Sequence, residues 1–311
     1  MRVAVMGAGA IGGYYGALLR QAGHEVAFIA RGEHLKAMQE RGLIIDSVHG
    51  SLHLTPVEAT GDAAGLVPVD LVLFCVKSHD TRAAAEQCKP LVGPSTAVLT
   101  LQNGVENDAV LAEVLGPDRV LVGACRISAT IREPGVIHQP SPFRHITFAE
   151  RDGSRSARAV AILAAFEKAG IPAEIGDDPR RVLWDKFLFL APLAGVTAVT
   201  LAPIGAVRDT PEAWDLLIEA VAEVERVGRA LGVPLPPDAV ERTLEAIRGA
   251  PADMKSSLQQ DREKGRYLEV DALSGAVVRL GTRVGVPTPV HRFLLASLAV
   301  HNTAVRNRTA G

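Results

Sequence analysis

Residues 1–31, MRVAVMGAGAIGGYYGALLRQAGHEVAFIAR, decide the fold of this chain. The short apolar run Val3–Met6 ends at a glycine-rich segment, and apolar and small residues then recur at helical spacing over Ile11–Ala22. A second apolar run of strand length, Glu25–Ala30, follows. The glycine-rich segment, Gly7–Gly12, has the pattern G-x-G-x-x-G. Between a strand and a helix, this pattern predicts a strand–loop–helix–strand unit that binds a dinucleotide.

Each glycine of the pattern has its own physical role. Gly7 permits the tight turn, Gly9 has no Cβ and lets the backbone approach a pyrophosphate, and Gly12 allows the helix to pack closely on the strand. The N-terminus of the helix adds N–H groups and the positive end of its dipole. These features predict that the pyrophosphate of a dinucleotide lies against this loop.

Arg31 follows the second strand, nineteen residues after Gly12. At about this place an NAD-specific site usually carries Asp or Glu, which binds the ribose hydroxyls. A guanidinium at the same place can hold a 2′-phosphate through two parallel hydrogen bonds. The sequence therefore predicts NADP(H) rather than NAD(H) as the cofactor, and the alternative is a solvated surface arginine.

The rest of the first half alternates strands and helices. Continuous apolar runs at Asp70–Val76 and Ala97–Leu101 predict buried parallel strands, because a sheet that helices cover on both faces is apolar throughout. The turn-rich stretch Ile131–Glu150 predicts a hairpin that extends this sheet. A helix over Ala157–Ala169 and a strand over Ile171–Ile175 are expected to complete the domain.

The second half has a different pattern. Asp178-Pro179 combines a capping residue with a proline at the first helical position, which signals the start of a helix. Helices are then expected at about residues 179–199, 211–230, 238–247, 268–284 and from 289 onward. The predicted architecture is α/β: an N-terminal Rossmann-type doubly wound sheet over residues 1–177, followed by an all-helical C-terminal domain over residues 178–311.

Composition limits the class of protein. Charged residues make up 22% of the chain and the formal net charge is −2, so the basic excess that favours nucleic-acid or membrane partners is missing. No apolar run is long and uninterrupted enough to span a bilayer. The three cysteines, Cys75, Cys88 and Cys125, have neither metal-ligand spacing nor a disulfide pattern. We expect a cytoplasmic protein with reduced thiols, and its apolar helices are compatible with a homodimer.

Lys186 is the one cationic residue in an apolar helical stretch, VLWDKFLFLAPLAGV. A helix this apolar is expected to be largely buried, and partial desolvation lowers the pKa of a lysine into a range that suits general acid–base work. An ammonium beside a carbonyl oxygen that gains negative charge both stabilises that charge and supplies a proton. The alternative is a lysine that reaches the surface or pairs with an acid.

With these features in place, the sequence resembles the ketopantoate reductase (2-dehydropantoate 2-reductase) family over essentially its whole length. The resemblance rests on the order and spacing of GAGAIGGYYGA at 7–17, Arg31, VKSHDT at 76–81, LQNGV at 101–105, Trp184-Asp185-Lys186, and KSSLQQDREKGRYLEVDAL at 255–273. It implies an oxidoreductase that uses NADPH to reduce a 2-oxo acid to a 2-hydroxy acid. The expected reaction is the reduction of 2-dehydropantoate (ketopantoate) to pantoate in pantothenate biosynthesis.

The resemblance also implies the roles of individual residues. Lys186 would be the catalytic proton donor, and no metal is implied. The cofactor would be held by Gly7, Ala8, Gly9, Ala10, Ile11, Gly12, Arg31, Lys77, Asn103, Ala129 and Glu269. The small-molecule substrate would be held by Lys186, Asn103, Ser257, Leu258, Gln259 and Gln260.

Several of these residues also have ordinary structural interpretations. Lys77 and Asn103 each follow a predicted strand, where ligands gather in open α/β sheets but where loops also carry polar residues. Ser256-Ser257 fits the cap of a helix that begins LQQDRE. Glu269, without the resemblance, would be interpreted as a solvated surface acid.

The chain departs from the family pattern near the predicted proton donor. The family typically has asparagines four, eight and eighteen residues after the catalytic lysine, and this chain has Leu190, Ala194 and Ile204 there. A buried substrate hydroxyl left without a partner costs roughly 1–3 kcal/mol. The substrate therefore either uses other groups, such as Thr197 or Thr200, or is a more apolar 2-oxo acid.

Two other functions remain open at this point. An opine-like dehydrogenase shares the two-domain plan, but that family more often uses a histidine–acid pair, and Lys186 argues against it. A non-catalytic NADP(H)-sensing protein would bind the cofactor tightly and consume no NADPH with any 2-oxo acid. An ammonium among apolar residues has no obvious purpose in such a sensor.

Overall fold

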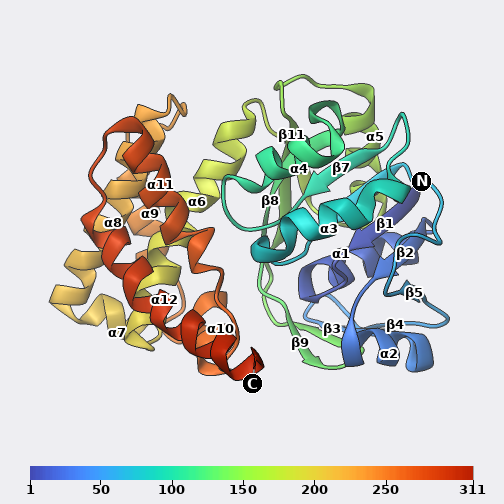
Figure 1. Ribbon diagram of the computed structural model, residues 1–311, viewed down its shortest axis with the longest axis horizontal. Coiled ribbons are helices and arrows are strands. Elements are labelled where there is room, and N and C mark those ends of the chain that lie inside the picture. Colours follow the sequence, from blue (N-terminus) through green and yellow to red (C-terminus); the bar gives the residue numbers. More distant parts are fainter. Residues whose placement is uncertain (311) are drawn as a thin grey trace. The chain divides into compact units, whose positions relative to one another are not determined.

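The computed structural model describes residues 1–310, and their contacts divide into two compact units. The first unit comprises Met1–Gln102 and Asn107–Val182, and the second comprises Asn103–Glu106 together with the chain from Leu183 onward. The first unit is built around β-sheets and the second from helices (Figure 1). The short segment Asn103–Glu106 thus belongs by its contacts to the helical unit, although its neighbours in sequence belong to the other.

The main sheet of the first unit has eight strands in the order β12-β11-β8-β7-β6-β1-β2-β5. Their bounds are β1 (Arg2–Met6), β2 (Glu25–Ile29), β5 (Glu58–Thr60), β6 (Leu71–Phe74), β7 (Ala97–Thr100), β8 (Val120–Ile127), β11 (Arg144–Glu150) and β12 (Ala173–Ile175). All neighbours pair in parallel except β8 and β11. From β1 the chain moves outward to β2 and later returns to β6 on the other side of β1. The strand order reverses there, and ligands of such sheets bind at the carboxyl ends of the strands at this place.

Helices cover both faces of this sheet because its central strands are apolar on both sides. Along β1, Val3 and Val5 belong to one buried cluster, and Ala4 and Met6 belong to another. The first cluster includes residues of α1 and α5, and the second includes residues of α3 and α4. The helices are α1 (Ala10–Gln21), α2 (Gly32–Arg41), α3 (Thr81–Cys88), α4 (Asn107–Leu115) and α5 (Ala157–Lys168), with the 3-10 helices η1 (Ser78–Asp80), η2 (Lys89–Leu91) and η3 (Pro117–Arg119). The predicted Rossmann-type doubly wound sheet is confirmed.

A second sheet of four strands corrects the predicted hairpin. The prediction placed residues 131–150 in an extension of the main sheet. Instead, the hairpin belongs to a separate sheet in the order β4-β3-β10-β9, with bounds β4 (Leu52–Leu54), β3 (Leu43–Ser47), β10 (Val136–Gln139) and β9 (Thr130–Glu133). Only β11 joins the main sheet, as the antiparallel partner of β8. The prediction was wrong because it did not include β3, which supplies a parallel partner for β10.

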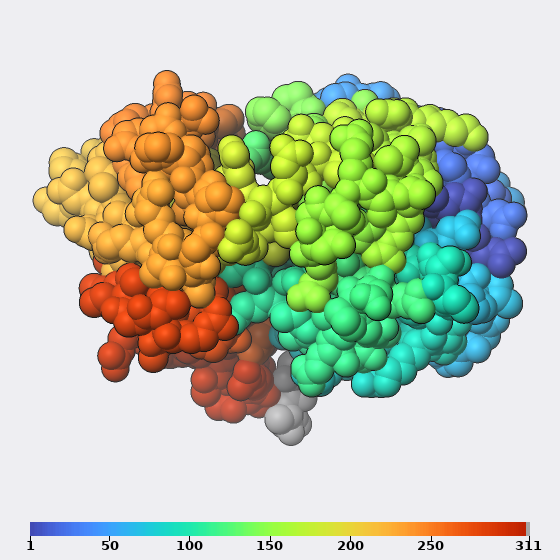
Figure 2. All heavy atoms as spheres, turned by 90° about the horizontal axis from the view of Figure 1, so that it is seen from above, coloured from blue at the N-terminus to red at the C-terminus, as the bar shows by residue number. Residues whose placement is uncertain are grey.

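The second unit is helical, as predicted. Its helices are α6 (Pro179–Thr200), α7 (Ile204–Asp209), α8 (Pro211–Ala230), α9 (Ala239–Arg248), α10 (Ser257–Glu263), α11 (Ser274–Val284) and α12 (Pro289–Ala310), with the 3-10 helix η4 (Glu269–Asp271). The first residues of α6, up to Val182, belong by their contacts to the first unit. Figure 2 shows residues near 250, in orange, at the surface of this unit. The helix expected from residue 268 begins only at Ser274, because the chain first forms the separate turn η4. The prediction did not include α7, and it mentioned α10 only as a short helix that Ser256-Ser257 would cap.

α6 is a long, mostly apolar helix. Its length and composition would suit a membrane span, but 67% of its apolar window is buried inside the protein. Buried side chains of α6, such as Phe187 and Leu188, belong to the same cluster as Leu217 and Val221 of α8. Burial of apolar surface of this kind stabilises a fold by about 25 cal/mol per Å². The expectation that the apolar stretch around Lys186 forms a largely buried core helix is confirmed.

Candidate active site

The glycine loop joins β1 to α1 at the place where the strand order reverses. Gly7 has φ +91°, a backbone conformation that L side chains rarely adopt. A Cβ built on Gly12 would lie 2.4 Å from the Gly7 carbonyl oxygen and 2.7 Å from Cγ1 of Val5, so helix and strand approach as closely as their backbones allow. A Cβ on Gly9 would meet no heavy atom within 4 Å. Gly12 is therefore required by packing, whereas Gly9 leaves open space of the kind that a pyrophosphate needs.

The rest of the loop is fixed by the neighbouring strand. The backbone N–H groups of Gly7 and Ala8 donate to the carbonyl of Ile29, at 3.1 and 2.8 Å. Ala8 is buried, whereas Ala10 and Ile11 are half-buried at the start of α1. Gly9 is the N-cap of α1 and no side chain caps this helix end. The loop suits a dinucleotide because a ligand that approaches the start of α1 meets backbone N–H groups and no side chain.

Arg31 lies at the start of α2, where it is the N-cap residue in extended conformation. Its side chain is 77% exposed and forms an ion pair with Asp80, with Nη2 and Oδ2 2.5 Å apart. Exposed pairs of this kind contribute only about 0–1 kcal/mol, so the guanidinium can exchange Asp80 for another anion at little cost. Asp80 was not singled out from the sequence, because nothing in the spacing of VKSHDT indicates a partner so far away in the chain.

Lys77 and Ala129 lie in loops of the first unit. Lys77 is exposed and is the N-cap residue of η1, three residues after β6 ends at Phe74. Its loop is braced by Gln102, which is buried and donates through Nε2 to the carbonyl of Val76 at 3.0 Å and to Oγ1 of Thr81 at 2.8 Å. Ala129 follows β8 and packs half-buried against the core that includes α1. The sequence analysis did not single out Gln102, whose hydrogen bonds fix this loop.

Lys186 and Asn103 are in direct contact in the second unit. Nζ of Lys186 donates to Oδ1 of Asn103 over 2.7 Å. Lys186 is half-buried, and its neighbours Trp184 and Phe187 are buried and stack edge to face. The structure therefore brings together two residues that the sequence analysis assigned to the site and that lie 83 positions apart.

A second contact fixes the other end of the segment Asn103–Glu106. Nη2 of Arg279 on α11 donates to a carboxylate oxygen of Glu106 over 2.7 Å, and Nη1 of the same side chain donates to Asp271 over 2.7 Å. Each of these groups is partly exposed to solvent. Because the segment is tied at both ends, the Asn103 amide is held where it meets Lys186. Neither Arg279 nor Glu106 was singled out, because no motif marks either residue.

The apolar residues that replace the family's asparagines lie mainly in the core. Ala194 and Ile204 have no exposed surface, and Leu190 is half-buried and packs against the same cluster. The hydroxyls of Thr197 and Thr200 donate to carbonyl groups of their own helix, at 2.7 and 2.9 Å. These threonines are therefore already partnered, and the polarity that the family has in this region is replaced by core packing.

The segment Ser257–Gln260 forms the first turn of α10. Ser256, which precedes it, caps the helix by accepting from the N–H of Gln259 at 3.1 Å, and it also shares a 2.8 Å hydrogen bond with Oγ1 of Thr197. The capping interpretation is confirmed for Ser256. Leu258 and Gln259 are buried, whereas Ser257 is exposed and Gln260 is half-buried. Of these four side chains, only Ser257 and Gln260 are accessible to a ligand.

Glu269 is buried, with 7% of its surface exposed, so its interpretation as a solvated surface acid is wrong. It lies in η4 rather than on a long exposed helix. Asn302 of α12 fixes this turn by exchanging two hydrogen bonds with the backbone of Leu268, at 2.8 and 2.9 Å. The burial was not predicted because it comes from tertiary packing and not from local sequence. Among residues 1–310, no group of three or more His, Cys, Asp or Glu side chains could hold a metal ion, and the three cysteines are free.

Comparisons with known proteins agree with this arrangement. The family model described as ketopantoate reductase PanE/ApbA matches residues 3–153, and the model of its C-terminal part matches residues 178–302. The chain is 35% identical to 2-dehydropantoate 2-reductase of Halobacterium salinarum, covering 94% of this chain and 96% of that protein. It is 34% identical to 2-dehydropantoate 2-reductase of Mesorhizobium japonicum, covering 95% and 96%. The crystal structure of a PanE/ApbA family ketopantoate reductase from Ralstonia eutropha superposes with a TM-score of 0.91 at 33% identity, covering 98% of this chain and all of that one. Because both parts of the fold match over nearly the whole length, the chain belongs to the ketopantoate reductase family.

Proposed function

We propose that this protein reduces 2-dehydropantoate to pantoate with NADPH, as a step in pantothenate biosynthesis. Enzymes of its family are NAD(P)-dependent oxidoreductases that act on a CH–OH group. The observation that carries the proposal is the 2.7 Å hydrogen bond from Lys186 to Asn103, which fixes an ammonium in a largely apolar stretch of α6. Neither an opine-type histidine–acid pair nor a purely sensory role accounts for that ammonium.

The cofactor would be held by the glycine loop and the residues after the neighbouring strands. Open space at Gly9, the tight packing at Gly12 and the exposed Arg31 guanidinium support this assignment. When bound, the reduced nicotinamide supplies the hydride that turns the keto carbon into a CH–OH carbon. We propose NADP(H) over NAD(H) because Arg31 stands where an NAD-specific site usually has an acid. Lys77, Asn103, Ala129 and Glu269 are the further contacts that the family resemblance implies.

Lys186 would act on the carbonyl oxygen of the substrate. As negative charge develops on that oxygen, the ammonium stabilises it, and a proton then passes from Nζ to the oxygen to form the hydroxyl group. Asn103 accepts a hydrogen bond from the same ammonium and therefore limits the rotamers that the long lysine side chain can adopt. Asn103 is thus proposed to bind substrate and to position the proton donor.

The substrate carboxylate would be held by the exposed side of α10. Ser257 is exposed and Gln260 is half-buried, whereas Leu258 and Gln259 support them from the core.

We accordingly propose residues 1–177 as the NADP-binding domain and residues 178–311 as the substrate and catalytic domain. Asn103 lies within the first of these ranges but is proposed to act with Lys186 of the second. A cytoplasmic enzyme with a small-molecule substrate and no nucleic-acid or membrane partner follows from this function, and sedimentation of the free protein distinguishes a monomer from the expected homodimer.

The test is NADPH consumption by purified enzyme with 2-dehydropantoate and, in parallel, with 2-oxo acids that have only apolar side chains. Lys186→Met is expected to lower kcat by about 10²- to 10⁴-fold and to leave the calorimetric dissociation constant of NADPH nearly unchanged. Lys168→Met, which removes an exposed lysine at the end of α5, is the matched control and should keep full activity. Near-normal turnover in Lys186→Met would reject the proton donor. A preference for the apolar acids would redirect the substrate to a more apolar 2-oxo acid, and no turnover with any acid would favour the sensing protein.

A further inference from the structure

Two buried polar side chains hold the loop that carries Lys77. Gln102 is 7% exposed, and its Nε2 donates to the carbonyl of Val76 over 3.0 Å. Thr81 is 3% exposed, and its hydroxyl donates to the carbonyl of Ser78 over 2.7 Å. Lys77 lies between these two carbonyl groups in the chain. The backbone is therefore fixed on both sides of Lys77.

The same two side chains also bind each other. The Gln102 amide donates its second hydrogen to Oγ1 of Thr81 over 2.8 Å, and its Oε1 accepts from the hydroxyl of Thr100 over 3.1 Å. Because the carbonyl of Val76 can only accept, the nitrogen of the amide must face it, and this contact determines how the amide is oriented. Both N–H groups and the oxygen of this amide are thus satisfied. Buried polar groups that are fully hydrogen-bonded form a rigid network.

The network is anchored on regular elements of the first unit. Thr100 is the last residue of β7, and Thr81 is the first residue of α3. Asn107, the first residue of α4, is buried with its Oδ1 3.2 Å from Oγ1 of Thr81. A side chain held from helices and strands is placed more precisely than one held by a loop alone. Lys77 lies on a loop, but its backbone is held from one strand and two helices.

We propose that Gln102 and Thr81 are positioning residues that fix the loop of Lys77 for the cofactor. This role rests on the proposed function, in which Lys77 contacts NADPH. A loop that is held in place before the cofactor arrives loses less conformational freedom on binding, and the cofactor binds more tightly for that reason. Neither side chain needs to touch the cofactor for this effect, since each acts on the backbone beside Lys77.

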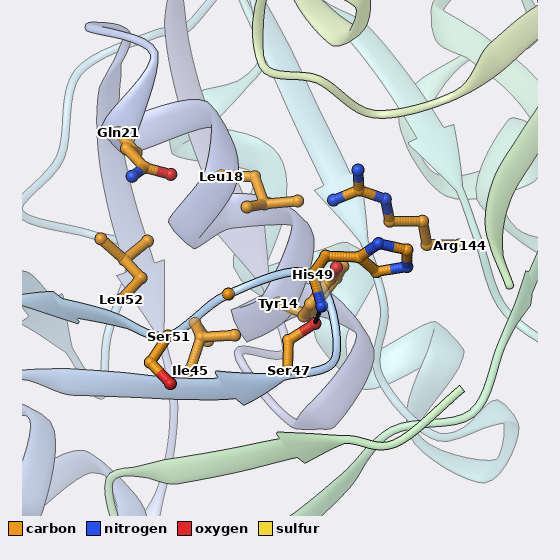
Figure 3. A pocket seen from close by; sticks show the side chains of 10 residues that line it. Tyr14, Leu18, Gln21, Ile45, Ser47, His49, Ser51, Leu52 and Arg144 are labelled. Atoms are coloured by element: carbon orange, nitrogen blue, oxygen red, sulfur yellow. Dashed lines mark hydrogen bonds between the residues drawn. The ribbon is translucent and has the colours of Figure 1, made fainter. Parts of the chain in front are cut away.

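Two other hydroxyl groups of the first unit provide matched controls. Thr96 is 1% exposed, directly precedes β7, and donates to the carbonyl of Val69 over 2.5 Å. It thus lies at the opposite end of β7 from Thr100. Ser47 of β3 accepts from the N–H of His49 over 3.1 Å, beside a small cavity that Figure 3 shows. Thr96→Val and Ser47→Ala therefore remove hydroxyl groups that hold other parts of the unit.

The experiment is calorimetric titration of NADPH into the full chain and its variants. Thr81→Val removes the hydroxyl at little change of shape, and NADPH should bind about tenfold more weakly. Thr81→Ser keeps the hydroxyl and should bind NADPH as the wild type does, and so should both control variants. In urea, Thr81→Val and Thr96→Val should both unfold at a lower concentration than the wild type, because each loses the hydrogen bonds of a buried hydroxyl. If Thr81→Val does not fold, Gln102→Met takes its place in the same comparison.

A second comparison tests whether Thr81 acts through Lys77. Lys77→Met should by itself weaken NADPH binding about 10- to 100-fold. Once the ammonium is absent, the place of its loop matters little to the cofactor. Thr81→Val added to Lys77→Met should therefore weaken binding further by less than about threefold, whereas independent effects would multiply.

The results that would overturn the inference differ from those that would overturn the proposed function. Wild-type NADPH affinity in Thr81→Val, an equal loss of affinity in Thr96→Val, wild-type affinity in Lys77→Met, or losses that multiply in the double variant would each reject the positioning role. A wild type that binds NADPH but reduces no 2-oxo acid would reject the proposed function alone, since the calorimetric comparison needs no turnover.

Discussion

Alanine at Gly9 and, separately, at Gly12 should break the same motif in two different ways. The added methyl group at Gly12 would lie 2.4 Å from the Gly7 carbonyl oxygen, 2.7 Å from Cγ1 of Val5 and 3.1 Å from Cβ of Cys75. Real Cβ atoms do not approach so closely, so either α1 or β1 must move. Overpacking of this kind typically costs about 1–3 kcal/mol, and Gly12→Ala should reach the upper end because the nearest atom is backbone.

Gly9→Ala should leave stability nearly unchanged. Its Cβ would meet nothing within 4 Å, and its backbone angles, φ −73° and ψ −158°, are open to alanine. Alanine is a poorer N-cap than glycine, but it also restricts the unfolded chain, which returns about 0.4–1 kcal/mol. The net change is expected within about 0.5 kcal/mol. The methyl group would nevertheless stand where the proposed site needs space for the pyrophosphate, and each lost charge-assisted hydrogen bond weakens binding by about 10- to 100-fold.

The assay pairs urea unfolding with calorimetric titration of NADPH for the wild type and both variants. Gly12→Ala is expected to unfold at a lower urea concentration than the wild type. Gly9→Ala is expected to unfold at the wild-type urea concentration but to bind NADPH at least tenfold more weakly, a loss of about 1.4 kcal/mol of binding free energy. The reasoning is refuted if Gly9→Ala binds NADPH within about twofold of the wild type, or if Gly12→Ala unfolds at the wild-type urea concentration.

Further perturbations test other parts of the structure. Arg31→Ala should raise KM for NADPH by about tenfold or more and KM for NADH little, and equal effects on both would remove the case for 2′-phosphate recognition. Ser256→Ala should cost about 1–2 kcal/mol of stability through the lost cap and the lost bond to Thr197, whereas Ser257→Ala should leave the urea midpoint unchanged and raise KM for the 2-oxo acid. Burial lowers the pKa of His291 from 6.5 to about 4, so the unfolded chain binds its proton first. Stability should therefore be full above pH 6.5, fall by up to about 3 kcal/mol as pH drops towards 4, and fall less in His291→Gln; parallel pH curves for the two proteins would contradict this.

The sequence predicts the strand–loop–helix–strand unit of residues 1–31 because the interactions that form it act between residues close together in the chain. A glycine whose φ must be positive, a glycine pressed against a strand and apolar runs of strand length all act within a few residues of one another, so residues 1–31 determined the strand–loop–helix–strand unit. The helical second unit followed likewise from residue spacing. The hairpin at 131–150 was misplaced because sheet membership depends on β3, a partner far away in the chain.

The same contrast holds within the candidate site. The sequence marked Arg31 and Lys186 by what is unusual about each residue type in its place. It did not show that Asp80 pairs with Arg31, that Asn103 accepts from Lys186, or that Glu269 is buried. Partners of this kind are chosen by packing between elements distant in sequence, and only the tertiary structure decided them. The sequence by itself determined which chemical groups the protein has and where the glycine loop turns; the tertiary structure determined which of those groups meet and which are shielded from water.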